Sequence, residues 1–232
     1  MAVRWYSSLP LSAAQVVQLL AERNIDVITR KVLNWVQTSG PQLAAAFRKY
    51  RRRVGRHWTV NELFCFRDTQ KLHVYRAVDE HGQVIDVLQW DKRNRASAEA
   101  FFRQALAHTD VTPKAIITDH HQPHMKAAAV VTPFARHVRT GLHRRRGYTT
   151  KPIERSHVPT RDRLRGTRGL RTVHTGQRFL ESFEGLYALR RGDVKLRVLV
   201  PRYRATTATV HETTWAVVVA MNVLGAQLQR AA

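Results

Sequence analysis

One carboxylate lies within a strongly basic stretch of this sequence. Between Arg136 and Arg171 there are twelve Lys and Arg residues and two acids, Glu154 and Asp162, so the segment carries +10 of the chain's formal charge of +22. Two interpretations of Glu154 are open. It is either a surface glutamate that pairs with neighbouring arginines, or a carboxylate that binds Mg²⁺ while the arginines hold a phosphate backbone.

A second candidate metal ligand is Asp119, which follows the strand-like run Lys114–Thr118. Ligands gather at the carboxyl ends of strands in open α/β sheets. Glu154 lies two residues after Pro152, and proline favours the first turn of a helix. Phosphoryl transfer by two metal ions needs carboxylates from separate elements that converge on ions about 4 Å apart. We therefore expect Asp119 and Glu154 to meet at a metal site, with Arg161 two helical turns beyond Glu154 on the same face.

The charge balance of the whole chain indicates a polyanionic partner. Its 232 residues include 39 Lys and Arg against 17 Asp and Glu, and the pI is near 11.4. This favours nucleic acid, with an anionic membrane surface as the alternative. The N-terminus lacks the apolar region of a signal peptide, and no apolar run reaches the roughly 20 residues of a membrane span. We expect a cytoplasmic protein whose single cysteine, Cys65, forms neither a disulfide nor a zinc site.

The N-terminal segment predicts two helices joined by a turn. Apolar residues recur at helical spacing through Ser12–Arg23, where Ser12 and Gln15 match a capping box. Asn24 follows and tolerates the left-handed backbone of a tight turn. This is the layout of a helix-turn-helix, or of an ordinary helical hairpin.

The second helix of this pair would place polar side chains outward and end at Gly40-Pro41. Its N-cap is either Asp26 or Thr29. The basic charge favours DNA binding by the outward face. The next segment, Gln42–Arg53, has a helical pattern with a basic end, which we expect to be a linker that contacts phosphate. The residues predicted to contact DNA in this region are Thr29, Arg30, Lys31, Asn34, Arg51, Arg52 and Arg53.

From Trp58 onward the pattern changes to short β runs, which predict a three-stranded antiparallel meander followed by alternating helices and strands. Asp79 and Asp86 fall in this meander, and we expect them to be turn or surface acids. The order suits an α/β domain with a mixed sheet. The predicted strands are Trp58–Phe66, Lys71–Asp79, Val84–Trp90, Lys114–Thr118 and Arg136–Leu142, with helices at Arg95–His108 and around Met125–Val131.

The C-terminal part predicts a helix over Thr172–Arg191, an extended segment over Val194–Val200 and an apolar helix over His211–Gln229. This tail packs either on the core or on a partner subunit. Elsewhere in the basic stretch, Arg144, Arg145 and Arg146 with Tyr148 form a candidate DNA-contact patch. Arg163 and Arg165 are further candidates. We do not predict a zinc site at His120, His121 and His124, because cysteines or a well-spaced histidine pair are missing.

Over nearly its whole length the chain resembles the DDE transposases of bacterial insertion sequences, specifically the insertion-sequence-six family. Between Asp119 and Glu154 lie 34 residues, the gap that is typical of this family. The stretches that carry the resemblance are LLAERNIDVITRKVLNWV, HWTVNELFCF, LHVYRAVDEHGQVID, FFRQAL, IITD, KPIERSHVPTRDRLRGTRGLR and the RRG at Arg190–Gly192.

The resemblance implies a small all-α helix-turn-helix domain with its linker helix at residues 1–50, an RNase H-like DDE domain at 51–192 and a C-terminal extension at 193–232. Such proteins bind the terminal inverted repeats of the element, cleave the donor DNA and join its 3′-hydroxyl to target DNA with Mg²⁺ or Mn²⁺. They are expected to act as homodimers or larger homo-oligomers on double-stranded DNA in the bacterial nucleoid. Arg161 and His157 match the family's basic residue after the glutamate and the histidine before it.

The sequence departs from the family at Asn61, which occupies the position of the first catalytic aspartate. An amide offers one neutral oxygen where the metal site requires an anionic carboxylate. The adjacent Glu62 should point to the opposite face of the strand, away from Asp119 and Glu154. Pro159 should also kink the Glu154 helix or reset its start.

Three explanations fit Asn61: a decayed or ancestral-style copy, an engineered inactive protein, or a relative retained for DNA binding alone. Each predicts severely reduced cleavage with DNA binding preserved. The alternative to an active transposase is thus a non-catalytic DNA-binding protein or regulator.

Overall fold

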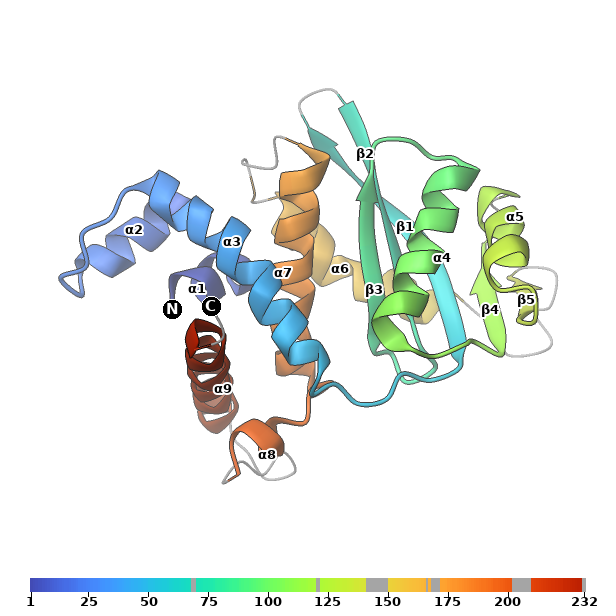
Figure 1. The fold of residues 1–232 in the computed structure, drawn as a ribbon. Helices are drawn as coiled ribbons and strands as arrows, with labels where there is room; N and C mark the ends of the chain where they lie inside the picture. The colour runs from blue at the N-terminus through green and yellow to red at the C-terminus, as the bar shows by residue number, and fades with distance from the viewer. Residues whose placement is uncertain are drawn as a thin grey trace. The chain divides into compact units, whose positions relative to one another are not determined.

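A computed structural model describes residues 1–67, 70–119, 122–140, 150–165, 167, 172–201 and 210–230. It divides into two compact units (Figure 1). The helical unit comprises Met1–Arg52 and Arg178–Ala232, and the sheet unit comprises Arg53–Gln177. The C-terminal helices therefore cluster in the same unit as the N-terminal helices.

The sheet unit contains a mixed five-stranded sheet in the order β3-β2-β1-β4-β5. Strands β1, β2 and β3 are antiparallel neighbours, whereas β4 is parallel to both β1 and β5. This is an RNase H-like arrangement, so the predicted α/β fold with a mixed sheet preceded by a helical segment is confirmed. The strands are β1 (His57–Arg67), β2 (Gln70–Val78), β3 (Val84–Trp90), β4 (Ala115–Thr118) and β5 (Arg136–Arg139).

Helices cover both faces of this sheet (Figure 1). On one face, Trp58 and Tyr75 form a buried apolar cluster with Phe101 and Phe102 of α4 and with small residues of α5. On the other face, Ile153 of α6 packs against the ends of β2 and β3. The helices are α4 (Arg95–Thr109), α5 (Gln122–Val131) and α6 (Lys151–Arg165). Alternation along the strands thus divides the sheet into an α4/α5 face and an α6 face.

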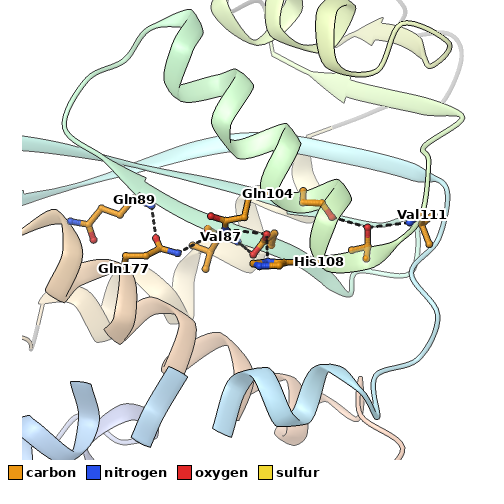
Figure 2. A network of polar contacts seen from close by, with 9 residues as sticks. Val87, Gln89, Gln104, His108, Val111 and Gln177 are labelled. Carbon is orange, nitrogen blue, oxygen red and sulfur yellow. Dashed lines mark hydrogen bonds and ion pairs between the residues drawn. The ribbon is translucent and has the colours of Figure 1, made fainter. Parts of the chain in front are cut away.

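A polar network fastens β3 to its neighbours (Figure 2). Asp86 is buried, and its carboxylate lies 2.8 Å from His108 Nδ1 and accepts a hydrogen bond of 3.1 Å from Gln104. Gln177 accepts from the backbone of Gln89 and donates to the backbone of Val87. The expectation of a surface acid was therefore wrong for Asp86, because α4 supplies the polar partners that permit its burial.

Asp79 is buried as well, although the prediction of a turn position was correct. Its carboxylate accepts hydrogen bonds from the backbone N–H groups of Gly55, His81 and Gln83. Gly82 in the same turn has a φ of 79°, which favours glycine. The acid therefore shapes the β2–β3 turn and ties it to the chain preceding β1.

The helical unit begins with a helix that sequence patterning did not identify, α1. The capping box at Ser12 and Gln15 is present at the start of α2, and Asn24 has the expected left-handed backbone with φ 56°. The N-cap of α3 is Ile28, and neither Asp26 nor Thr29 fills this position. The described helices of this unit are α1 (Ala2–Ser8), α2 (Ala13–Ala21), α3 (Thr29–Arg48), most of α7 (Val173–Arg191), α8 (Leu196–Leu199) and α9 (Val210–Arg230).

Helix α3 continues through Gly40-Pro41, where the sequence predicted its end. A Cβ on Gly40 would lie 1.8 Å from Ser182 Oγ, so glycine allows α3 and α7 to approach closely. The packing of buried Val36, Leu43 and Phe47 on this helix outweighs the donor that proline lacks.

The segment after α7 also differs from the strand-like or extended conformation that the sequence predicted. Leu196–Leu199 is a short helix. Val194, which precedes this helix, forms an isolated β-bridge with Arg51. In the described part of the chain, no helix is long and apolar enough to cross a membrane.

Candidate active site

The sheet register brings Asn61 next to Asp119. Thr59 of β1 pairs with Ile117 of parallel β4, and Asn61 and Asp119 each lie two positions further along. Side chains two positions apart share a face of the sheet, and neighbouring strands lie about 4.8 Å apart. Continuation of the register therefore places residue 61 beside Asp119 at the carboxyl end of β4.

Asp119 combines access to solvent with a buried neighbour. Its side chain is 37% exposed, and Oδ1 lies 3.5 Å from Nδ1 of His124, which is fully buried in α5. The imidazole of His124 meets the ring of Tyr75 edge-on, with centroids 5.5 Å apart. His124 therefore serves as a buried neighbour of the acid, while His120 and His121 fall outside the described residues.

Arg76 connects the strand of Asn61 to the helix of Glu154. It is the cross-strand partner of Asn61 in the β1–β2 pair and is completely buried. Its Nη1 donates to the carbonyl oxygen of Ser156 at 2.8 Å and lies 3.0 Å from the Ser156 hydroxyl. Sequence reasoning missed this residue, although a lone charge inside the apolar run of β2 was the available signal. The guanidinium therefore holds α6 against the strands at a point two residues beyond Glu154.

Glu154 lies in the first turn of α6, as predicted. Its carboxylate is exposed and accepts a hydrogen bond of 2.7 Å from the Thr150 hydroxyl. The helix runs without a break through Pro159 to Arg165, so the expected reset at Pro159 was wrong. Since seven residues make about two turns, the exposed Arg161 lies on the same helix face as Glu154.

His157 is buried in α6 beneath this surface, with 2% of its area exposed. Burial, together with the positive charges of Arg76 and Arg161, lowers the pKa of His157 to about 3. Its Nε2 has no hydrogen-bond partner among the described residues. The imidazole is therefore neutral at ordinary pH and adds no charge to those of Arg76 and Arg161.

Glu62 faces away from this cluster. Its carboxylate contacts the guanidinium of Arg93 and lies 3.6 Å from Nδ1 of His73. His73 lies two positions before Tyr75 on β2, so both side chains lie on the α4/α5 face. The prediction that Glu62 cannot replace the missing aspartate is consistent with these contacts, because the side chain is held on the opposite face.

The donor set suits a divalent cation only in part. The carboxylate oxygens of Asp119 and Glu154 are ligands that Mg²⁺ and Mn²⁺ prefer, whereas Asn61 offers an uncharged amide oxygen. Among the residues that the structure describes, no group of three His, Cys, Asp or Glu side chains is arranged to hold a metal ion. The three predicted positions therefore supply two carboxylates, and Asn61 supplies no charge.

The residues predicted to contact DNA are distributed over both units. Thr29, Arg30, Lys31 and Asn34 are all exposed on the first turns of α3. The connection between α2 and α3, residues 22–28, is longer than the turn of roughly four residues found in many helix-turn-helix proteins. An exposed polar and basic helix surface is therefore present at the predicted place.

The basic residues elsewhere differ in their environments. Arg53 and Arg165 are exposed, Arg51 is half-buried, and Arg52 pairs with Asp193 at 3.3 Å. Arg163 is only 4% exposed, so the prediction of a surface contact was wrong there; α6 turns this residue toward the protein interior. Arg144, Arg145 and Arg146 lie outside the described residues.

Comparisons of the sequence with known proteins find similarity to a DDE domain family and to transposases. A family described as a DDE domain matches residues 55–193. The transposase for insertion sequence-like element IS431mec of Staphylococcus aureus is 27% identical over 188 residues, which cover 81% of this chain and 82% of that protein. The transposase for insertion sequence element IS257 in transposon Tn4003, also from Staphylococcus aureus, has the same identity and coverage.

Among solved structures, the simian T-cell lymphotropic virus intasome in complex with PP2A regulatory subunit B56 gamma has a chain that matches with a TM-score of 0.32 at 16% identity. The match covers 56% of this chain and 51% of that chain, and it is too distant to bear on function.

Proposed function

Because this chain belongs to the DDE transposases of the insertion-sequence-six family, we propose that it binds the terminal inverted repeats of a mobile element and that its cleavage and strand-transfer activity is impaired. The substrate is double-stranded DNA, at the element ends and at the target. The impairment follows from a single position, Asn61.

The register of β1 and β4 is the observation that supports this proposal most directly. If this register continues for two positions beyond the Thr59–Ile117 pair, the amide of Asn61 and the carboxylate of Asp119 meet at the end of the sheet. The buried Arg76 contacts the helix of Glu154 from the strand position opposite Asn61. A DDE centre needs acids on these three elements, and two of the three carry one.

Asp119 and Glu154 are the residues that would hold a divalent ion, Mg²⁺ or Mn²⁺. When bound, such ions activate the attacking hydroxyl and stabilise the leaving oxygen of the phosphodiester. Asn61 contributes no charge to this site, so the affinity for metal falls and the DNA is poorly cleaved. Arg161, exposed on the face of Glu154, holds a phosphate beside the reacting bond.

The exposed side chains at the start of α3 are proposed to recognise the inverted repeats, through Arg30, Lys31 and Asn34. A formal charge of +22 supports additional contacts with the phosphate backbone. Since two element ends must be held together for transposition, we expect a homodimer or a larger homo-oligomer on DNA.

A second candidate function is that of a non-catalytic DNA-binding protein that competes for element ends. Asn61 favours it, since the described residues lack a complete three-acid group. The two functions predict different results for an aspartate at position 61: strand transfer returns if the protein is an impaired transposase, and it does not return if the protein only binds DNA.

The test is strand transfer with Mn²⁺ on DNA that carries the element ends, for the unaltered chain, Asn61→Asp and Asn61→Ser. We expect a trace of product from the unaltered chain and from Asn61→Ser, and a gain of at least about 100-fold from Asn61→Asp. Asn61→Asp combined with Asp119→Asn is the matched control and should return to the trace level. Full activity of the unaltered chain would refute the impairment, and an Asn61→Asp protein that binds DNA without reacting would favour the non-catalytic function.

A further inference from the structure

Strands β1 and β2 extend beyond the rest of the sheet at the end where Asp119 lies. The ladder between β1 and β4 stops at Thr59, while β1 itself continues to Arg67. On the other side, the ladder between β2 and β3 stops at His73. Among the described residues, residues 63–66 of β1 therefore have no partner in β4 and residues 70–72 of β2 have none in β3, and we name these two segments the ribbon.

The ribbon carries two exposed aromatic rings on one face. Phe64 and Phe66 are 53% and 65% exposed, and they lie two positions apart on the same strand. Their ring centroids are 5.8 Å apart at an angle of 83°. The two rings therefore contact each other edge to face, and much of their surface remains accessible to solvent.

A cation accompanies these rings. Lys71 is the cross-strand partner of Phe66, and its Nζ lies 4.2 Å from the centroid of Phe64. Phe64 pairs in turn with His73, which pairs with Trp90, so a row of aromatic side chains continues across three strands on this face. Aromatic rings interleaved with basic groups are the combination that binds single-stranded nucleic acid, since rings stack on bases and cations contact phosphates.

We propose that the ribbon binds an unpaired segment of DNA, with a base stacked on Phe66 and the adjacent phosphate beside Lys71. This inference depends on the proposed function for the presence of DNA. Phe64 and Phe66 alternate with Asn61 along β1, so they share the α4/α5 face with Glu62 and lie on the opposite face of the strand from Asn61.

The chemistry of the ribbon favours a single strand over other occupants. Bases within a duplex are stacked on one another, so they expose no face to Phe66. A second copy of this chain would have to cover the ammonium of Lys71 along with the rings, and burial of an unpaired cation is costly. A phosphate backbone instead neutralises this charge.

The experiment uses the full chain and one DNA sequence in two forms, a 20-nucleotide single strand and the corresponding duplex. The single strand contains one 2-aminopurine, whose fluorescence falls when it stacks on an aromatic ring. We expect quenching with the unaltered chain, and Phe66→Ala should remove it and weaken single-strand binding by about 5- to 150-fold. Duplex binding should remain unchanged.

Phe134→Ala is the matched control, because Phe134 is a 94% exposed phenylalanine of the sheet unit that lies outside the ribbon. It should bind both DNA forms like the unaltered chain. Lys71→Gln should reduce the salt dependence of single-strand binding by about one phosphate contact.

The outcomes separate this inference from the proposed function. Unchanged single-strand binding and quenching in Phe66→Ala, with duplex binding intact, would overturn the ribbon proposal and leave the proposed function standing. Absence of binding to either DNA form in the unaltered chain would overturn both. A change of oligomeric state in Phe66→Ala, measured by sedimentation without loss of single-strand binding, would identify the ribbon as a self-contact and also overturn the proposal.

Discussion

Replacement of His157 by glutamine should make the protein less sensitive to mild acid. In the folded chain, burial and the charges of Arg76 and Arg161 lower the pKa of His157 to about 3, whereas an unfolded histidine has a pKa of about 6.5. Between these two values the unfolded state binds more protons than the folded state. Stability is therefore lost as the pH falls through this window, and it is retained above pH 6.5.

The size of the effect follows from the two pKa values. Between pH 8 and pH 5, proton binding to the unfolded histidine costs the parent about 2 kcal/mol of stability. This figure depends mainly on the unfolded pKa, because the folded group is nearly unprotonated at pH 5. The loss reaches about 4 kcal/mol at pH 3 and approaches about 5 kcal/mol below pH 3, where the full difference in pKa is expressed.

The assay is urea unfolding of the parent and His157→Gln at pH 8 and pH 5, followed by tryptophan fluorescence. The stability lost between the two pH values should be about 2 kcal/mol smaller in the variant, whatever its stability at pH 8. Taking the difference between proteins cancels the contributions of the other titrating groups. His174→Gln, at an exposed position of α7, is the matched control and should keep the parent's pH dependence. Equal losses in His157→Gln and the parent would refute the argument that burial holds this imidazole neutral.

Three further predictions concern separate features. Pro159→Ala should raise the free energy of unfolding by about 1–3 kcal/mol in urea, because it restores a helix donor and removes a ring clash inside α6; a lower value would mean that the ring packs favourably. Asp86→Ala should lower the free energy of unfolding by about 1–3 kcal/mol, since His108 and Gln104 lose a buried acceptor. An unchanged free energy of unfolding would show that the network contributes nothing to stability. DNA affinity should fall by roughly 10³-fold or more between about 50 and 200 mM salt, as neutralisation of six or more phosphates requires, and salt-independent binding would contradict this charge-based account.

Local patterns in the sequence were sufficient for most elements and for the spacing of the acids. Strand alternation, capping residues such as Ser12, and turn formers such as Asn24 act within a few residues, so they specify periodicity and boundaries wherever the chain is read. Alternation alone also separated Glu62 from the face of Asp119. The spacing of 34 residues between Asp119 and Glu154 is likewise a property of the sequence alone.

Burial was decided by the tertiary structure, because it depends on which distant side chains arrive at each position. Arg76 and Arg163 are both basic residues in basic or polar surroundings, yet both are buried once α6 packs against the sheet. Asp86 loses its access to water because α4 supplies its polar partners. No spacing rule in the sequence distinguishes these residues from exposed ones, since the groups that compensate their charge lie on other elements.

The same reasoning applies to the helix breakers. A proline has the same intrinsic cost at position 41 and at position 159, and the sequence alone predicted the end of a helix at the first and a kink or a reset start at the second. Helices α3 and α6 continue through both, because the contacts made by their buried faces exceed that cost. The chain thus determined its elements and its candidate acids locally, while the packing of one element on another determined which charges face water.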